Sequence, residues 1–173
     1  MPAECERLGE ITGQAYTGDG LLDQSEEDTY LNRPARRGRP GRRRRGAGRR
    51  TERGRNGEVL GGVTFAPPGS PLADVAGPHE AEFRMLAVAP EARGTGIGEA
   101  LVRACTERAR AFDGLTALTL STRPAMRGAQ RIHTRLGFVR TPELDWPPNP
   151  ALTLLTYRLE LWGHAQQRPG HNI

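Results

Sequence analysis

With 173 residues the chain has the size of one domain, and no stretch of it approaches the ~20 apolar residues of a membrane-spanning helix. The formal net charge of +5 is local, because residues 33–55 carry 12 of the 25 arginines with one glutamate and the rest of the chain has a net charge of −6. The lack of lysine excludes the Walker phosphate loop, the kinase strand lysine and a pyridoxal Schiff base. No basic and apolar leader opens the chain and the two cysteines lack metal-ligand spacing, so we expect a soluble cytoplasmic protein without a metal.

The N-terminal part, residues 1–31, is predicted to be helical. Over residues 4–17 apolar residues recur at helical spacing, namely Leu8, Ile11 and Ala15, which predicts a short helix. Ser25 is a good N-cap and acidic residues follow it, so a second short helix is expected over residues 25–31.

Residues 32–56 interrupt this pattern with arginine, glycine and proline. The stretch 33–55 has no large apolar residue, so it cannot add to a core and we expect it to lack an ordered strand. Three interpretations stay open: a frame error or degenerate segment, a solvated linker, or an arm that binds RNA or DNA through its arginines. The third is the weakest, because no aromatic residue is interleaved for base stacking.

A strand, a glycine turn and a helix follow one another over residues 82–112. Residues 83–88 alternate and then become wholly apolar, which predicts a strand buried on both faces where it ends. The turn is Arg93-Gly94-Thr95-Gly96-Ile97-Gly98, and apolar residues at helical spacing follow it. The first N–H groups of such a helix lack partners, so the junction indicates a phosphate site. The alternative is a turn that only lets the helix pack closely on the sheet.

The rest of the chain predicts further strands and one helix. We expect strands over residues 58–65, 115–121 and 151–161, a short strand from residue 138, and a helix over residues 124–136. Residues 142–150 are expected to form a loop, and the tail 162–173 to be unstructured.

Two of these motifs resemble the GCN5-related N-acetyltransferase (GNAT) family. Arg93-x-x-Gly96-x-Gly98 after the apolar strand resembles the family's acetyl-coenzyme A (acetyl-CoA) signature. Residues 130–138, Gln-Arg-Ile-His-Thr-Arg-Leu-Gly-Phe, resemble its closing helix and the strand entry that follows. The two motifs occur in the family's order, and the resemblance covers residues 57–161 well.

The resemblance implies an α/β fold with a mixed, mostly antiparallel twisted sheet, whose splayed central parallel pair is flanked by helices. It implies that acetyl-CoA binds where this pair diverges, held by Leu86, Val88, Arg93, Gly94, Thr95, Gly96, Ile97 and Gly98. The chain then divides into an N-terminal helical part (1–31), the arginine-rich segment (32–56), the acetyltransferase core (57–161) and the tail (162–173).

The implied reaction is direct attack by a primary amine, on a small molecule or a peptide, on the thioester of acetyl-CoA. Glu82 is the expected base, and the N–H of Val88 is expected to polarise the carbonyl. His133 stands where the family usually has tyrosine, and it is the expected acid for the leaving thiolate.

Two other functions stay open: a catalytically silent relative that binds acetyl-CoA, and a nucleic-acid binder that uses residues 33–55. The sequence does not identify the acceptor. Four acidic residues either flank the entrance for the acceptor, where they would favour a cationic amine, or are ordinary solvated charges: Asp74, Glu80, Glu143 and Asp145. The oligomeric state is also open, with a homodimer as one option.

Overall fold

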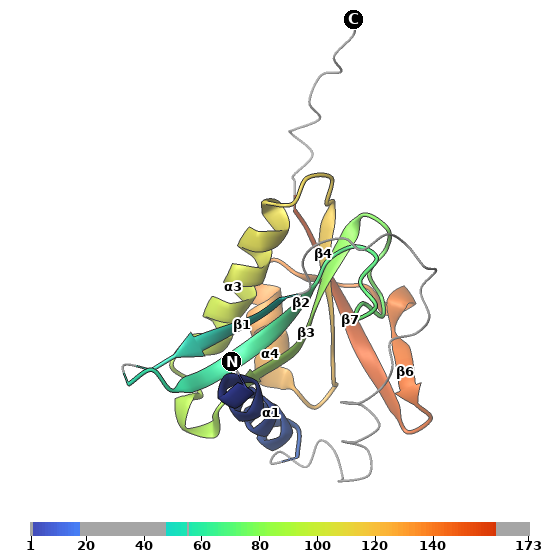
Figure 1. The fold of residues 1–173 in the computed structure, drawn as a ribbon. Coiled ribbons are helices and arrows are strands. Elements are labelled where there is room, and N and C mark those ends of the chain that lie inside the picture. Colours follow the sequence, from blue (N-terminus) through green and yellow to red (C-terminus); the bar gives the residue numbers. More distant parts are fainter. Residues whose placement is uncertain (1, 18–47, 55, 162–173) are drawn as a thin grey trace, which may run out of the picture.

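A mixed sheet runs through the part of the chain that the computed structural model describes, residues 2–17, 48–54 and 56–161 (Figure 1). Its strands are β1 (Gly48–Arg53), β2 (Val59–Ala66), β3 (Glu80–Val88), β4 (Ala117–Thr122), β5 (Val139–Arg140), β6 (Trp146–Asn149) and β7 (Leu152–Glu160). They lie in the order β1-β2-β3-β4-β7-β5, and β6 pairs with β7 beside this path. Only β3 and β4 are parallel among these paired strands, which confirms the predicted fold class.

Three α-helices of the described ranges cover the sheet: α1 (Pro2–Thr17), α3 (Ile97–Arg110) and α4 (Arg127–Arg135). Figure 1 shows α1 on one face of the sheet and α3 with α4 on the other. Two short 3-10 helices, η1 (Pro90–Ala92) and η2 (Pro142–Leu144), follow β3 and precede β6. None of the helices in these ranges is long and apolar enough to cross a membrane.

The adjacent glycines of β2 show why the helices lie so close to the sheet. Successive strand residues point to opposite faces, so Gly61 faces α3 and Gly62 faces α1. A Cβ on Gly61 would lie 3.1 Å from a methyl of Ile97 in α3 and 2.8 Å from the carbonyl oxygen of Ala87 in β3, and one on Gly62 would lie 2.4 Å from a methyl of Leu8 in α1. Both glycines are therefore needed for close helix packing.

The main core lies between the sheet and α3. Val63 and Phe65 of β2 pack there with Leu101 and Cys105 of α3, and each of the four is at most 2% exposed. Burial raises the pKa of the Cys105 thiol to about 12, so this cysteine is a small core residue, as the sequence predicts. A second cluster lies between α1 and the sheet, and it includes Ile11.

Strand β1 corrects the prediction that residues 33–55 lack an ordered strand. Residues 48–53 pair antiparallel with β2, from Gly48 opposite Phe65 to Arg53 opposite Val59. The backbone ladder forms this strand, and at the edge of a sheet arginine side chains can extend over the surface, so no large apolar residue is required. Among the described residues the sheet therefore includes residues 48–53, which precede the core expected over residues 57–161.

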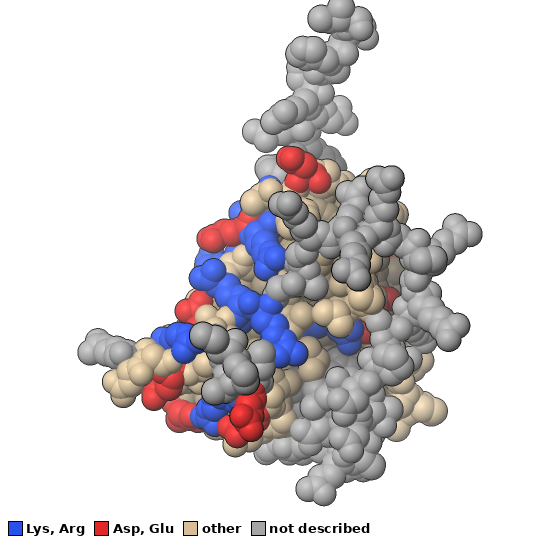
Figure 2. Space-filling model, in the orientation of Figure 1, with Lys and Arg blue, Asp and Glu red and all other residues tan. Residues whose placement is uncertain are grey.

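Residues 32–47 and 55 of the arginine-rich segment lie outside the described residues, as do the predicted helix at 25–31 and the tail at 162–173. In the described part, Figure 2 shows basic side chains gathered over β1 and the neighbouring α3. The exposed arginines of these two elements are Arg49, Arg50, Arg53, Arg103 and Arg110.

The predicted loop at residues 142–150 is also corrected. It contains η2 and the short strand β6, which pairs through Trp146 opposite Leu154 and Asn149 opposite Leu152. This strand was not predicted because two prolines occupy its centre, and proline is tolerated in a strand only at an edge or an irregular position. The other predicted strands and the helices at 4–17 and 124–136 are confirmed within a few residues.

Candidate active site

The parallel strands β3 and β4 diverge after a short paired stretch. Their register covers only residues 80–82 of β3 and 117–119 of β4. Beyond it, a bulge sets Met85 and Leu86 of β3 against the single residue Val63 of β2. Met85 has a φ of 56°, a left-handed conformation that costs a non-glycine residue free energy. A bulge bends its strand and increases its twist, which accounts for the divergence.

A groove of about 660 Å³ lies at this divergence, lined by the end of β3, the glycine turn, the first turn of α3, and α4. Seven of the eight residues expected to hold the cofactor line it: Leu86, Val88, Arg93, Gly94, Gly96, Ile97 and Gly98. Thr95 does not line it, because its hydroxyl donates a hydrogen bond to the carbonyl of Ala92 at 2.6 Å. The turn therefore contributes backbone and glycines to the groove, and little side-chain bulk.

The start of α3 presents uncapped N–H groups to the groove. Gly94 and Gly96 have φ values of 78° and 90°, which reverse the chain just before the helix and which only glycine adopts without strain. Gly96 is the N-cap and no side chain caps the helix. The N–H groups of the first helical turn are thus left for a ligand, at the positive end of the helix dipole.

Arginines of α4 form the opposite wall of the groove. Arg127, Arg131 and Arg135 line it at intervals of four residues, so they share one face of the helix. These three arginines were not among the residues predicted for the site. Their signal was present, because three arginines at i, i+4 and i+8 beside a predicted anion site indicate a positively charged wall.

One acidic residue, Glu99, lies in this positive environment. It belongs to the first turn of α3, lines the groove, and forms ion pairs with Arg103 of its own helix and Arg135 of α4. The hydrogen bond from Arg103, followed by that from Arg135, lowers the pKa of the Glu99 carboxyl. Glu99 therefore ties α3 to α4 as an anion, next to the N–H groups that face the groove.

A smaller cavity of about 30 Å³ lies deeper in the gap between β3 and β4. Leu86, Met126 and Ala129 line both it and the groove, so the two hollows adjoin. Its other lining residues include Phe83, Ser121 and His133. A space of this size admits about one water molecule or a methyl-sized group.

His133 lies at the wall of the small cavity. Its ring is 2% exposed and packs against Phe83, Phe138 and Tyr157, with ring centroids about 6 Å apart. Its Nδ1 has no hydrogen-bond partner in the described part of the chain. Burial lowers the pKa of His133 to about 4, so the ring is neutral at pH 7.

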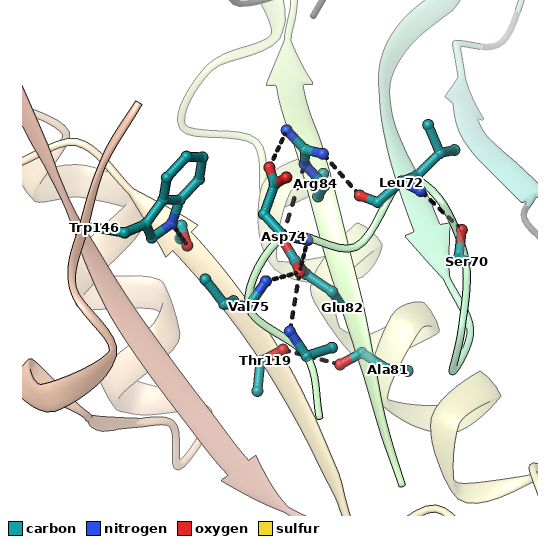
Figure 3. Close-up of polar contacts among 11 residues, drawn as sticks. Ser70, Leu72, Asp74, Val75, Ala81, Glu82, Arg84, Thr119 and Trp146 are labelled. Atoms are coloured by element: carbon teal, nitrogen blue, oxygen red, sulfur yellow. Dashed lines mark hydrogen bonds and ion pairs between the residues drawn. The ribbon is translucent and has the colours of Figure 1, made fainter. Parts of the chain in front are cut away.

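Glu82 is sealed beneath the loop that joins β2 to β3 (Figure 3). Its side chain is 1% exposed, and Oε2 accepts hydrogen bonds from the N–H groups of Asp74 and Val75 at 2.8 and 2.9 Å. Burial raises the pKa of Glu82, and the loop N–H groups and Arg84 offset part of this effect. Glu82 lines neither the groove nor the small cavity, so the structure does not bring this predicted base to His133.

The four acidic residues considered for an acceptor entrance are mostly engaged with arginines. Asp74 pairs with Arg84 at 2.9 Å, Glu80 with Arg158 at 2.8 Å, and Asp145 with Arg140 at 2.7 Å, whereas Glu143 is exposed.

Within residues 2–17, 48–54 and 56–161, no group of three or more His, Cys, Asp or Glu residues is arranged to hold a metal ion.

The sequence of this chain matches the model of a known protein family. The sequence model of the acetyltransferase (GNAT) family matches residues 22–138, more than half of the chain. The chain belongs to the GNAT acetyltransferase family. The match spans β1 to α4 and so includes the diverging strands, the glycine turn and His133. Among curated proteins, none matches the sequence at a significant level.

Solved structures of GNAT acetyltransferases are similar to this fold. One is yncA from Salmonella typhimurium, described as an acetyltransferase and determined with its cofactor acetyl-CoA; it is 20% identical, with a TM-score of 0.59 over 98% of this chain and 94% of that one. Another is the ribosomal-protein-alanine N-acetyltransferase from Brucella melitensis, 21% identical, with a TM-score of 0.60 over 92% and 96%. A third, from Desulfovibrio desulfuricans, is 16% identical, with a TM-score of 0.63 over 94% and 95%. At these identities the likeness shows the fold.

Proposed function

We propose that this GNAT protein transfers an acetyl group from acetyl-CoA to a primary amine, on a small molecule or a peptide, by direct attack. The observation that carries the proposal is the groove at the divergence of β3 and β4, which joins an uncapped helix N-terminus to a small cavity beside His133. The groove suits a long ligand with phosphates at one end, and the cavity suits a small acyl group at the other. Acetyl-CoA has this shape and supplies an activated thioester.

The phosphate end of the groove is built from backbone and arginine. The N–H groups at the start of α3 would hold a diphosphate from one side, and Arg127 and Arg131 of α4 would hold it from the other, because both elements line the groove. Gly96 and Gly98 let the phosphate oxygens approach these N–H groups, because neither carries a side chain in the way. The donor set therefore fits a diphosphate.

The reacting end lies along the free edge of β3. Ala89 donates its N–H to the carbonyl of Leu60 in β2 at 2.8 Å. Because successive N–H groups of a strand point to opposite edges, the N–H of Val88 points into the gap. It can polarise the thioester carbonyl there, and the amine then attacks the carbonyl carbon while the C–S bond breaks.

Two proton transfers accompany the reaction. The amine must lose a proton, and the leaving thiolate must gain one. His133 lines the cavity, and as a neutral ring it can donate an N–H hydrogen bond to the sulfur. Glu82 is held by loop N–H groups and lines neither hollow, so we assign it to positioning the loop.

Calorimetry and steady-state assays on the full chain test the function. Acetyl-CoA should bind, and an amine panel should show release of CoA thiol that depends on both substrates. Binding that Gly96→Ala weakens by about tenfold or more, with turnover of at least one amine, supports the proposal. A chain that neither binds acetyl-CoA nor releases thiol would end it.

One observation favours a second candidate, a catalytically silent relative. His133 replaces the tyrosine usual in this family, and its burial keeps it neutral, while the predicted base is sealed away. A silent relative would bind acetyl-CoA with normal heat and release no thiol with any amine. His133→Tyr would then be the informative variant, because a gain of turnover would show that only the acid was missing.

A further inference from the structure

The small cavity carries an uncompensated positive charge. Arg123, which directly follows β4, lines it, and the Nη1 atom of Arg123 is buried without a hydrogen-bond partner in the described residues. Its backbone is fixed, because Gln130 of α4 donates to the carbonyl of Arg123 at 3.0 Å and to that of Pro124 at 2.9 Å. A buried guanidinium donor without a partner is unusual and calls for a ligand or a water molecule.

The second charged residue of the cavity wall, Arg84, does not need such a partner. Its guanidinium pairs with Asp74 at 2.9 Å and donates to the carbonyl of Leu72 at 2.7 Å, and Glu82 lies 3.8 Å away (Figure 3). No acidic residue lines the cavity. Its excess charge therefore comes from Arg123.

The acidic residues nearby offer little to a cationic acceptor. Asp74, Glu80 and Asp145 are each paired with an arginine of the protein. A polyamine that entered here would meet Arg123 and no uncommitted carboxylate among the residues that line the cavity. Charge complementarity thus favours an acceptor that brings its own anionic group.

We propose that the acceptor is an amine that also carries a carboxylate, a free amino acid or an amino-acid-like small molecule, and that Arg123 binds this carboxylate. The inference rests on the proposed function and names its substrate class. Arg123 is only partly buried, so the carboxylate binds at the mouth of the cavity. The cavity itself is filled by the acyl group, and the amine points towards the thioester in the gap between β3 and β4. The N-terminus of a long peptide lacks a carboxylate at this distance and is a poorer match.

The test is a thiol-release assay on the full chain with matched sets of acceptors. Each set holds a free amino acid, its amide, and the amine that decarboxylation would leave. The free amino acid should have a kcat/KM higher by about tenfold or more than its two partners, because it alone makes a charge-assisted pair with the guanidinium. Arg123→Gln should reduce this preference to near unity through KM for the acceptor, and Arg123→Lys should keep part of it.

Arg110→Gln is the matched control, because Arg110 is exposed on α3, lines neither hollow, and its loss changes the net charge equally. Thermal unfolding shows whether each variant is folded. Two results would overturn this inference without contradicting the proposed transferase activity. One is an equal kcat/KM for acceptors with and without the carboxylate. The other is an Arg123→Gln variant that raises KM for acetyl-CoA and leaves KM for the acceptor unchanged.

Failure of the proposed function has a different signature, which is no turnover with any amine. Calorimetry with N-acetyl amino acids and their amides, in the presence of CoA, then decides the inference separately. Binding that requires both the carboxylate and Arg123 supports it. Equal binding of acid and amide, or binding of neither, overturns it.

Discussion

The carboxylate of Glu82 accepts a hydrogen bond from the main-chain N–H of Val75 at 2.9 Å, which ties β3 to the loop between β2 and β3. Burial raises the pKa of Glu82 above 4.5. Folding therefore favours the protonated carboxyl, so this group's contribution to stability is complete below pH 4.5 and is lost as the pH rises through the raised pKa.

Glu82→Gln should remove this pH dependence. Its amide oxygen can still accept from the loop, and its neutral group does not titrate. The free energy of unfolding should fall less in the variant than in the wild type as the pH rises from 4.5 towards neutrality, measured by urea denaturation. Glu107→Gln, at an exposed position of α3, should behave as the wild type does. Parallel pH profiles of Glu82→Gln and wild type would contradict the prediction.

The same substitution separates a positioning role from general-base catalysis. Removal of a general base lowers kcat by roughly 10²- to 10⁴-fold. If Glu82 only holds the loop, kcat should change by about threefold or less, and the pH profile of kcat should keep its shape. A large loss with a displaced pH profile would return Glu82 to the list of catalytic residues.

His133 should make the protein sensitive to mild acid. Its pKa is about 4 in the folded chain and 6.5 when unperturbed, so the unfolded chain binds the proton more tightly. Stability from this group is complete above pH 6.5 and falls by about 3 kcal/mol as the pH drops to about 4. His133→Phe retains an aromatic ring and should lack this loss in urea denaturation. An equal loss in both proteins would assign the acid sensitivity to other groups.

The glycine turn should bind acetyl-CoA through its backbone. Gly96→Ala places a Cβ on a residue with a φ of 90°, which should cost about 1 kcal/mol of stability and weaken acetyl-CoA binding by about tenfold or more. Gly57→Ala is the control, because its φ of 79° imposes a similar backbone cost in an exposed turn away from the groove. Calorimetry should separate the two, and equal loss of binding in both would argue against the turn as a phosphate site.

Arg131 should act on the phosphates and not on the thioester. Arg131→Gln should raise KM for acetyl-CoA by about tenfold, since it removes a charge-assisted contact on the groove wall. With S-acetylpantetheine, which lacks the diphosphate, the variant and the wild type should have the same kcat/KM. An equal defect with both donors would place Arg131 elsewhere in the reaction.

Glu99 should weaken acetyl-CoA binding in the native protein. Its carboxylate lies in the first turn of α3 and occupies Arg135, so it competes with a phosphate for the same positive charge. Glu99→Gln should therefore lower KM for acetyl-CoA by about two- to fivefold. Glu107→Gln on the same helix should leave KM unchanged, and a raised KM in Glu99→Gln would show that the ion pair positions Arg135 for binding instead.

The strand, turn and helix around Gly96 could be predicted because their signals are local. Alternation, glycine and helical spacing together predict the uncapped helix start without any long-range contact. The local motif at residues 130–138 also identified His133 as a candidate site residue, but it did not predict the environment of the His133 ring. Burial, the lowered pKa and the unpartnered Nδ1 depend on Phe83 and Tyr157, which come from distant strands.

The features that the sequence alone does not reveal depend on tertiary contacts. Strand β1 has no apolar signature, and only its ladder with β2 makes it a strand. Glu82 has the sequence position of a base, but the loop that seals it is defined by hydrogen bonds to Asp74 and Val75, which no periodicity encodes. The sequence likewise does not predict that Arg123 has a buried Nη1 without a hydrogen-bond partner. That depends on the fold, which pairs Asp74 with Arg84 and not with Arg123.

The exposed arginines of the edge strand β1 also affect how two molecules of this protein can associate. An outer strand with unpaired backbone groups can recruit a strand from another molecule and start aggregation. In β1, Arg49, Arg50 and Arg53 are exposed, so two such edges repel each other as they approach. The composition that makes this segment look unable to fold thus protects the sheet against polymerisation.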